Sequence, residues 1–213
     1  MASYDFTARG YLKRARSRLV EATEESLLYA ALELRSGIEA RMKEYLETQT
    51  HISHKLREGW RIPEMAKGLR QAFDIGDKFL LVRLLDSVTN EELTFFVYTP
   101  VTRKTQKLGA QLGEYLHAPQ GKRDEAWWKR VKATVIIADA GLENATLGSL
   151  LGVPLVHPNH SGFSIRAESW EPDDRRQEII DELQRAKRPF KLDIRYFDEL
   201  VRKDTTPNPG SKH

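Results

Sequence analysis

The sequence contains no cysteine, and this absence excludes a disulfide framework, a thiolate nucleophile and a zinc site built on sulfur. No apolar run approaches the length of a membrane span, and residues 1–11 carry acidic and aromatic side chains instead of the apolar core of a signal peptide. Neither a Walker phosphate loop nor a dinucleotide-binding glycine fingerprint is present. The sequence therefore predicts a cytoplasmic protein without a membrane anchor, and it indicates neither a metal nor a cofactor.

Composition sets the scale of the fold. The chain has 213 residues, of which 40% are hydrophobic, so it can bury one good core or two small ones. Its formal net charge is +3, on a surface rich in charges of both signs. This net charge permits a nucleic-acid partner without requiring one. Whether the chain binds nucleic acid is therefore judged from local clusters of positive charge.

A long helix is expected over residues 23–49. Its apolar residues recur at alternating steps of three and four, which places them on one stripe of a helix. They are Leu27, Ala31, Leu34, Ile38, Met42 and Tyr45. Thr23 is a suitable N-cap, and the two glutamates that follow it lie where the helix dipole favours negative charge. At about 1.5 Å per residue this helix would be roughly 35 Å long, the spine of a helical bundle.

Residues 7–22 repeat the helical pattern and carry the strongest basic cluster in the chain. The cations of this cluster, with no acidic residue until Glu21, are Arg9, Lys13, Arg14, Arg16 and Arg18. A row of cations can follow a nucleic-acid backbone, because it releases the counterions of the phosphates. The alternative is a solvated helix face whose cations pair with glutamates on the same helix or on a neighbouring one.

These two segments resemble the first two helices of a HEPN domain. The resemblance is carried by YLKRARSRL, which starts at Tyr11, and by YAALELRSGIE, which starts at Tyr29. It covers about the first third of the chain. It implies a compact helical bundle that often forms dimers and that occurs in prokaryotic toxin-antitoxin and phage-defence systems, frequently as a metal-independent ribonuclease.

The ribonuclease motif of that family, an arginine followed a few residues later by a histidine, is not matched in this chain. The histidines beside the bundle are His51 and His54, and the nearest upstream arginine, Arg41, is distant in sequence. Arg57 follows the histidines, so the order is reversed. His54 and Arg57 could still share a helix face and set a general base beside a phosphate-binding cation. The structural alternative leaves the histidines in contact with solvent or backbone.

A change of character near residue 75 marks the second part of the chain. Residues 78–85 and 93–99 are rich in aromatic and branched side chains and flank a polar loop, which predicts an antiparallel pair of strands. A helix is expected over residues 103–117, with Arg103, Lys104 and Lys107 at its start. Cations at a helix N-terminus oppose the dipole, so either a bound anion or tolerance by a solvated surface explains them.

Two adjacent tryptophans, Trp127 and Trp128, precede an apolar run at residues 131–138 that is typical of a buried strand. We expect one tryptophan in the core and the other near the surface. An exposed tryptophan beside Lys129 and Arg130 would suit base stacking, and the alternative is a core or lid residue.

The loop at residues 157–162 has the most polar chemistry of the remaining sequence. Its candidate ligands are His157, Asn159, His160 and Ser161, and Asp139 could join them. Such a set could hold a metal or a phosphate, but a plain turn around Pro158 explains the composition equally. Beyond this loop, a last strand is expected at residues 190–194 and a helical turn at 196–200.

The expected fold is therefore α+β, with a helical bundle in residues 1–75, a small mixed β-sheet with flanking helices in 76–203, and a disordered tail in 204–213. The preferred function is a non-catalytic binding or assembly subunit of a defence or toxin-antitoxin system. We expect it to form a homodimer or bind a protein partner, and its basic helix suggests contact with RNA or DNA. The rival functions are a degenerate metal-independent ribonuclease and a sensor of a nucleotide or small molecule.

Overall fold

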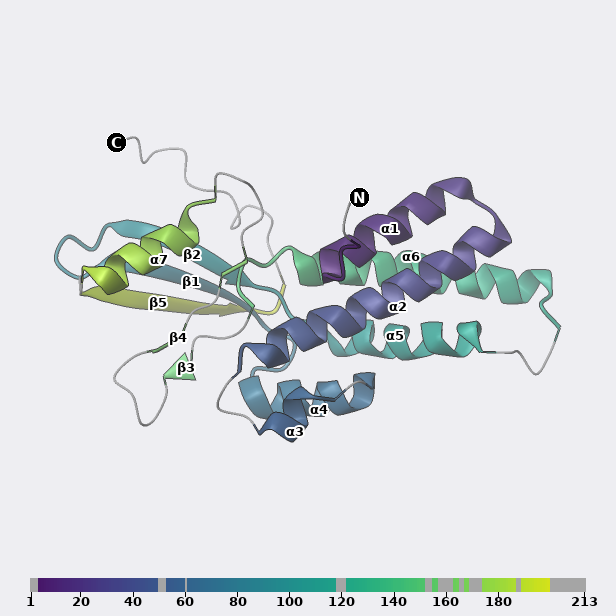
Figure 1. Ribbon diagram of the computed structural model, residues 1–213, viewed down its shortest axis with the longest axis horizontal. Helices are drawn as coiled ribbons and strands as arrows, with labels where there is room; N and C mark the ends of the chain where they lie inside the picture. The colour runs from purple at the N-terminus through teal and green to yellow at the C-terminus, as the bar shows by residue number, and fades with distance from the viewer. Residues whose placement is uncertain are drawn as a thin grey trace. The chain divides into compact units, whose positions relative to one another are not determined.

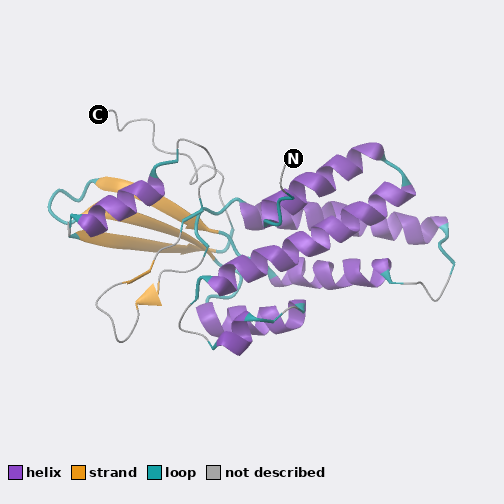
Figure 2. Ribbon diagram, viewed as in Figure 1, coloured by secondary structure: helices purple, strands orange, loops and turns teal. Residues whose placement is uncertain are grey.

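The computed structural model describes residues 4–49, 53–59, 61–117, 122–151, 155–156, 163–164, 167–168, 174–186 and 189–199. Helices and a three-stranded antiparallel sheet form this part of the chain (Figures 1 and 2), which confirms the α+β class. The chain divides into two compact units that alternate along the sequence. The described parts of Met1–Gly76 and Val101–Leu147 form a helical unit, and those of Asp77–Pro100 and Gly148–His213 form a sheet unit.

The described residues of the helical unit contain α1 (Ala8–Glu21), α2 (Glu24–Glu47), α3 (His54–Arg57), α4 (Ile62–Phe73), α5 (Arg103–Leu116) and α6 (Glu125–Thr146). Helix α2 contacts each of the other helices, and α1, α5 and α6 lie along it (Figure 1). The helix expected over residues 23–49 is thus the central element of the unit. In the described part of the chain, no helix combines the length and the apolar character that a membrane crossing needs.

Local sequence fixes the start and the buried side of α2. Thr23 Oγ1 accepts a hydrogen bond from the Ser26 amide, and Ser26 Oγ accepts one from the Thr23 amide, both at 3.0 Å. This reciprocal capping box satisfies amides that a helix start leaves free. Leu34, Ile38 and Met42 of the predicted stripe are fully buried. Complete burial of such a side chain contributes about 1.5–3 kcal/mol each, so packing stabilises α2 more than its caps do.

Two glycines let the helices approach α2 closely. A Cβ at Gly37 of α2 would lie 2.5 Å from a methyl carbon of Leu142 on α6 and 3.0 Å from the Tyr11 Cβ on α1. A Cβ at Gly109 of α5 would lie 2.7 Å from a methyl carbon of Ile62 on α4. These separations are shorter than van der Waals contact, so side chains at these positions would force the helices apart.

The sheet unit contains β1 (Phe79–Asp86), β2 (Glu92–Tyr98), β3 (Leu155–Val156), β4 (Phe163–Ser164), α7 (Arg176–Arg185) and β5 (Phe190–Phe197). The order β2-β1-β5 makes β1 the central strand, and Leu80 of β1 lies opposite Tyr98 of β2 and Tyr196 of β5. Helix α7 lies along one face of these strands (Figure 2) and buries Ile180 and Leu183. Strands β3 and β4 pair with each other.

The predicted strand at residues 131–138 is wrong, because this run lies in the middle of α6. Val131, Val135 and Ala138 face the core of the helical unit, whereas Ile136 and Ile137 are 55% and 43% exposed. The low helix propensity of β-branched residues amounts to less than about 1 kcal/mol each, and tertiary packing overrides it.

The expected domain division also differs from the observed grouping. Residues 101–147 were expected in the second domain, but α5 and α6 pack on α2 and complete the helical unit. The helical turn expected at residues 196–200 is wrong at its start, because residues 196 and 197 continue β5. The tail at residues 204–213 lies outside the described residues.

Candidate functional site

Two arginines of the basic cluster on α1 bind the last turns of α6. Arg9 donates a hydrogen bond to the Thr146 carbonyl, with 2.9 Å between Nη2 and the oxygen. Arg16 forms ion pairs with Asp139 and Glu143, each at 3.0 Å. The hydrogen bonds to these carboxylates, that to Asp139 first, raise the pKa of Arg16 above its ordinary value. Both arginines therefore join α1 to α6.

Arg14 and Arg18 have carboxylate partners as well. Arg14 Nε lies 2.9 Å from Glu33 of α2, and Arg18 Nη1 lies 3.0 Å from Glu21. Lys13 is exposed and forms no ion pair with the residues that the structure describes. Four of the five cations predicted to contact phosphates are thus bound by carboxylates or a carbonyl of the helical unit. This arrangement agrees with the alternative reading of α1, a helix face whose cations have partners on the same helix or a neighbouring one.

The residues that precede α1 are held by a local hydrogen bond. The Thr7 amide donates to Asp5 Oδ1 at 2.9 Å. This bond and that from the Thr7 side chain, with the nearby positive charge of Arg14, lower the pKa of Asp5. Thr7 is in turn the N-cap of α1, because its Oγ1 accepts from the Gly10 amide at 3.1 Å.

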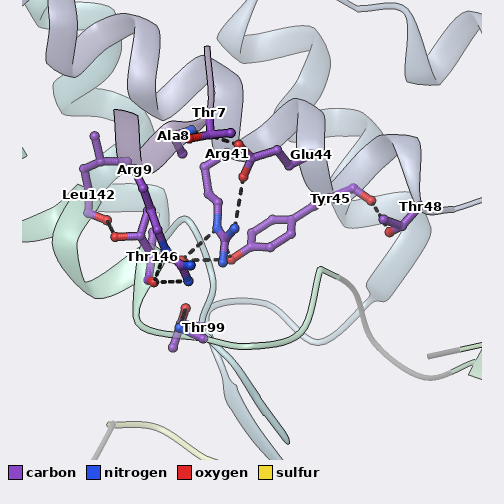
Figure 3. A network of polar contacts seen from close by, with 12 residues as sticks. Thr7, Ala8, Arg9, Arg41, Glu44, Tyr45, Thr48, Thr99, Leu142 and Thr146 are labelled. Atoms are coloured by element: carbon purple, nitrogen blue, oxygen red, sulfur yellow. Dashed lines mark hydrogen bonds and ion pairs between the residues drawn. The ribbon is translucent and has the colours of Figure 1, made fainter. Parts of the chain in front are cut away.

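A buried polar network links α2 with the ends of α1 and α6 (Figure 3). Arg41 is fully buried, and its Nε donates to the Tyr45 hydroxyl and to the Ala145 carbonyl, each at 2.9 Å. Its Nη1 lies 3.0 Å from Glu44 Oε2. The other carboxylate oxygen of Glu44 accepts from the Ala8 amide at 2.8 Å. One arginine and one glutamate thereby connect three helices.

The network sets each charge where a helix dipole favours it. Arg9 and Arg41 bind the Thr146 and Ala145 carbonyls at the negative end of α6, and Glu44 binds the first amide of α1 at its positive end. These are the positions that leave backbone groups unpaired in an isolated helix. The geometry is that of a structural junction, and its role is to fix the helix ends.

Sequence reasoning missed the role of Arg41, although a signal was present. Arg41 follows Ile38 by three residues and precedes Tyr45 by four, so it lies on the buried side of α2. A cation on such a stripe needs a buried partner, since an unpaired charge is costly to bury. The spacing therefore indicates a buried ion pair, but it does not identify the partner helix.

The candidate ribonuclease residues are not assembled into a site by the described contacts. His54 lies on α3 with 74% of its side chain exposed, and its Nδ1 lies 3.1 Å from Glu58 Oε2. Arg57 lies on the same short helix and is half-buried. His51 lies outside the described residues. The neighbour of the His54 imidazole is therefore a carboxylate on the surface.

The cations of the predicted anion site at the start of α5 lie on the surface. Arg103, Lys104 and Lys107 are all exposed. Thr102 caps the helix, because its Oγ1 accepts from the Thr105 amide at 3.2 Å. A solvated surface tolerates such cations, and a bound anion at this helix start stays a prediction.

The polar loop with His157, Asn159, His160 and Ser161 lies outside the described residues. Asp139, its suggested companion, binds Arg16. Within the residues that are described, no group of three or more histidine or acidic side chains could hold a metal ion.

Helix α6 presents an apolar surface on its outward side. Ile136 and Ile137 are exposed, and so are Ala133 and Ala140, about one turn to either side. We call these four residues the outer face of α6. The sequence missed this surface because the run was assigned to a buried strand.

An aromatic and basic group of residues lies at the start of the same helix. Both tryptophans are half-buried, instead of one in the core and one at the surface as expected. The rings of Trp127 and Trp128 are 4.7 Å apart at an angle of 85°, and Tyr115 of α5 packs edge-on against Trp127 at 5.7 Å. The Arg123 guanidinium lies 5.3 Å from the centre of the Trp127 ring.

Comparison with known proteins gives no relative: no protein-family model, no curated protein and no solved structure matches this chain. The resemblance to HEPN domains therefore depends on the residues of α1 and α2 alone.

Proposed function

We propose that this protein is a non-catalytic assembly subunit that forms a homodimer through the outer face of α6. The observation that carries the proposal is the exposure of Ile136 and Ile137 at the centre of a long helix. A surface helix of a globular protein normally directs such residues to the core and polar residues to the solvent. Covering the exposed half of each isoleucine would contribute about 1 kcal/mol.

The outer face is suited to a second copy because its sequence is self-complementary in an antiparallel arrangement. With a two-fold axis between Ile136 and Ile137, each isoleucine lies level with an isoleucine of the second copy, and Ala133 lies level with Ala140 of the second copy. Alanines on both sides of the isoleucines allow the two helix backbones to approach closely, as small residues do at helix crossings.

The charges that border the outer face favour the same antiparallel arrangement. Lys129 and Arg130 precede the isoleucines, whereas Asp139 and Glu143 follow them. Glu143 keeps 38% of its side chain exposed although it binds Arg16. An antiparallel second copy brings the basic half of one helix beside the acidic half of the other, and it also opposes the two helix dipoles. A parallel copy would set like charges side by side.

The biological setting follows only from the resemblance. HEPN-like chains occur in defence and toxin-antitoxin systems, and we propose the same setting for this chain. The test is the identity of the neighbouring genes, because such systems are encoded together with their partners. A ribonuclease function remains a separate prediction: it requires RNA cleavage that is lost in His54→Ala, and cleavage unaffected by that change would exclude His54 as its base.

Self-association is tested by measuring the mass of the full chain in solution. Sedimentation equilibrium should give a mass near twice the chain mass of 24.5 kDa. Ile136→Glu should give a monomer with an unchanged helical circular dichroism spectrum, because it places a charge in the apolar contact. The matched control is Val88→Glu, at an 83% exposed apolar residue of the β1–β2 turn, which should remain dimeric. A monomeric wild-type chain, or a dimer that tolerates Ile136→Glu, would refute the proposed interface.

A further inference from the structure

We infer that the start of α6 carries a binding site for single-stranded nucleic acid. The site is a tryptophan patch formed by Arg123, Trp127, Trp128, Arg130 and Lys132. The inference is tested by ligand binding and not by the oligomeric state, although Arg130 also borders the outer face of α6.

The tryptophans of this patch form a firmly held aromatic platform. Trp127 and Trp128 stand nearly perpendicular to each other, so their ring faces point in different directions. Tyr115 supports Trp127 from α5, and the Tyr115 hydroxyl is held by Gln111 Nε2 at 2.7 Å and by Thr134 Oγ1 at 3.2 Å. A platform that is fixed before binding loses little conformational freedom when a ligand stacks on it.

The cations of the patch, unlike the arginines of α1, are free to bind a phosphate. Arg130 and Lys132 are exposed and form no ion pair with the described residues. Arg123 lies over the Trp127 ring and forms no ion pair with a carboxylate of the described residues. On α1, by contrast, the arginines are held by carboxylates or carbonyls. The patch therefore offers positive charge that is free to meet phosphates, which the arginines of α1 do not.

The two acidic residues in the first turn of α6 already have partners. Asp124 is the N-cap of α6, because its Oδ1 accepts from the Trp127 amide at 2.8 Å. Glu125 pairs with Lys129, with 2.7 Å between Oε1 and Nζ. Glu114 near the end of α5 is exposed and is a further negative charge on this side of the unit. Free cations outnumber free carboxylates around the tryptophans.

Aromatic faces beside unpaired cations fit single-stranded nucleic acid better than other anions. Unpaired bases stack on indole rings while their phosphates contact lysine or arginine, and every base offers such a face. In a duplex the bases stack on one another, so their faces are closed to tryptophan. When a base stacks on Trp127, the Arg123 guanidinium leaves the ring and becomes available to the adjoining phosphate. An acidic peptide would use the cations but would have no need of the paired indoles.

The experiment measures binding of the full chain to a fluorescein-labelled oligonucleotide of about ten nucleotides, the range that one single-strand site covers. Fluorescence anisotropy is recorded between about 50 and 200 mM salt. Trp128→Ala should weaken binding about tenfold and leave the salt dependence unchanged, and Trp128→Phe should restore most of the affinity because phenylalanine still stacks.

Charge variants separate this site from the face of α1. Arg130→Gln with Lys132→Gln should weaken binding and lower the slope of log affinity against log salt by about 1.4, since each single-strand phosphate contact contributes about 0.7. The matched control is Arg16→Gln, which removes a cation that is paired with α6 and should leave binding unchanged. Circular dichroism of every variant establishes that it is folded.

Four results would overturn the inference. The first is that the chain binds neither RNA nor DNA strands, and the second is that it binds a duplex of the same length with equal affinity. The third is that Arg16→Gln loses as much affinity as the α6 variants. The fourth is that poly-glutamate displaces the labelled strand at the same charge concentration as an unlabelled strand does.

Discussion

Replacing Arg41 by methionine should destabilise the helical unit by about 3 kcal/mol. Methionine fills much of the volume but makes none of the hydrogen bonds of the guanidinium to Glu44, Tyr45 and the Ala145 carbonyl. Removing one partner of a buried ion pair costs about 3–5 kcal/mol, because the other partner stays buried without compensation. We expect the lower end of this range, since Glu44 keeps 21% of its side chain exposed and can bind water. A loss of this size is a large part of the 5–15 kcal/mol that stabilises a typical domain.

The measurement is a urea titration of the full chain followed by far-ultraviolet circular dichroism, which reports chiefly on the helical unit. Lys43→Met is the matched control on the same helix. Lys43 lies 3.8 Å from Glu47, and both side chains are more than half exposed, so its loss should cost less than about 0.5 kcal/mol. The two substitutions remove the same charge and differ mainly in burial.

A double-mutant cycle gives the contribution of the pair itself. Glu44→Gln keeps an acceptor for the Ala8 amide, removes the negative charge and turns an NH2 group, which cannot accept a hydrogen bond, toward Arg41. The double variant should lose less unfolding free energy than the two single variants lose together, and the difference should be at least about 1 kcal/mol. If Arg41→Met unfolds within about 1 kcal/mol of the wild-type chain, the network does not hold the helix ends together and the reasoning is wrong.

Four further substitutions test other parts of the helical unit. Gly37→Ala should lower the melting temperature, because its Cβ would overlap two neighbouring helices at a cost of about 1–3 kcal/mol. Gly113→Ala should be neutral or stabilising, because the new Cβ meets only the flexible end of the Arg35 side chain. Arg16→Gln should lose less than about 1 kcal/mol, and the loss should shrink when salt is added; a salt-independent loss would contradict an ion-pair origin. The folded state lowers the pKa of Asp5 below its ordinary value of 3.8, so its stabilisation is present above that pH and is lost as the pH falls through the folded pKa. Asp5→Asn should therefore lower the free energy of unfolding at neutral pH, by less than about 1 kcal/mol since the site is exposed. In strong acid the variant should be as stable as the wild-type chain. A difference in stability that persists in strong acid would exclude the carboxylate as its cause.

The elements that the sequence predicts correctly are those that depend on local rules. The apolar stripe of α2, the Thr23 cap and the pair of strands β1 and β2 follow from periodicity and from the residues that begin and end each element. Such patterns are readable because the residues that produce them lie within a few positions of each other.

Helix α6 shows where a short window misleads. The run at residues 131–138 is apolar and β-branched, which favours a strand. Over the whole helix, the buried residues recur at Val131, Val135, Ala138, Leu142 and Ala145, which is a helical spacing. A window of two more turns would have indicated a helix, because strands of that length are uncommon.

The roles of the arginines could not be predicted, because their partners are distant in the chain. Arg16 and Asp139 are 123 residues apart, and Arg9 and Thr146 are 137 apart. No local rule relates such positions: the packing of α1 on α6 brings them together. The same packing gives the arginines of α1 carboxylate or carbonyl partners, a distinction that counting cations does not reveal.

The central strand of the sheet has a consequence for synthesis on the ribosome. β1 meets β2 within a few residues, but its other neighbour, β5, is translated only after α5 and α6. A nascent chain synthesised as far as Thr146 contains every described helix of the helical unit. It also contains the β1–β2 hairpin, in which the edge of β1 that will bind β5 is still open. Open edges recruit other strands, and the open edge here is that of β1, whose Leu80, Val82 and Leu84 are buried in the full chain. Products truncated at that point should therefore aggregate more readily than the full chain.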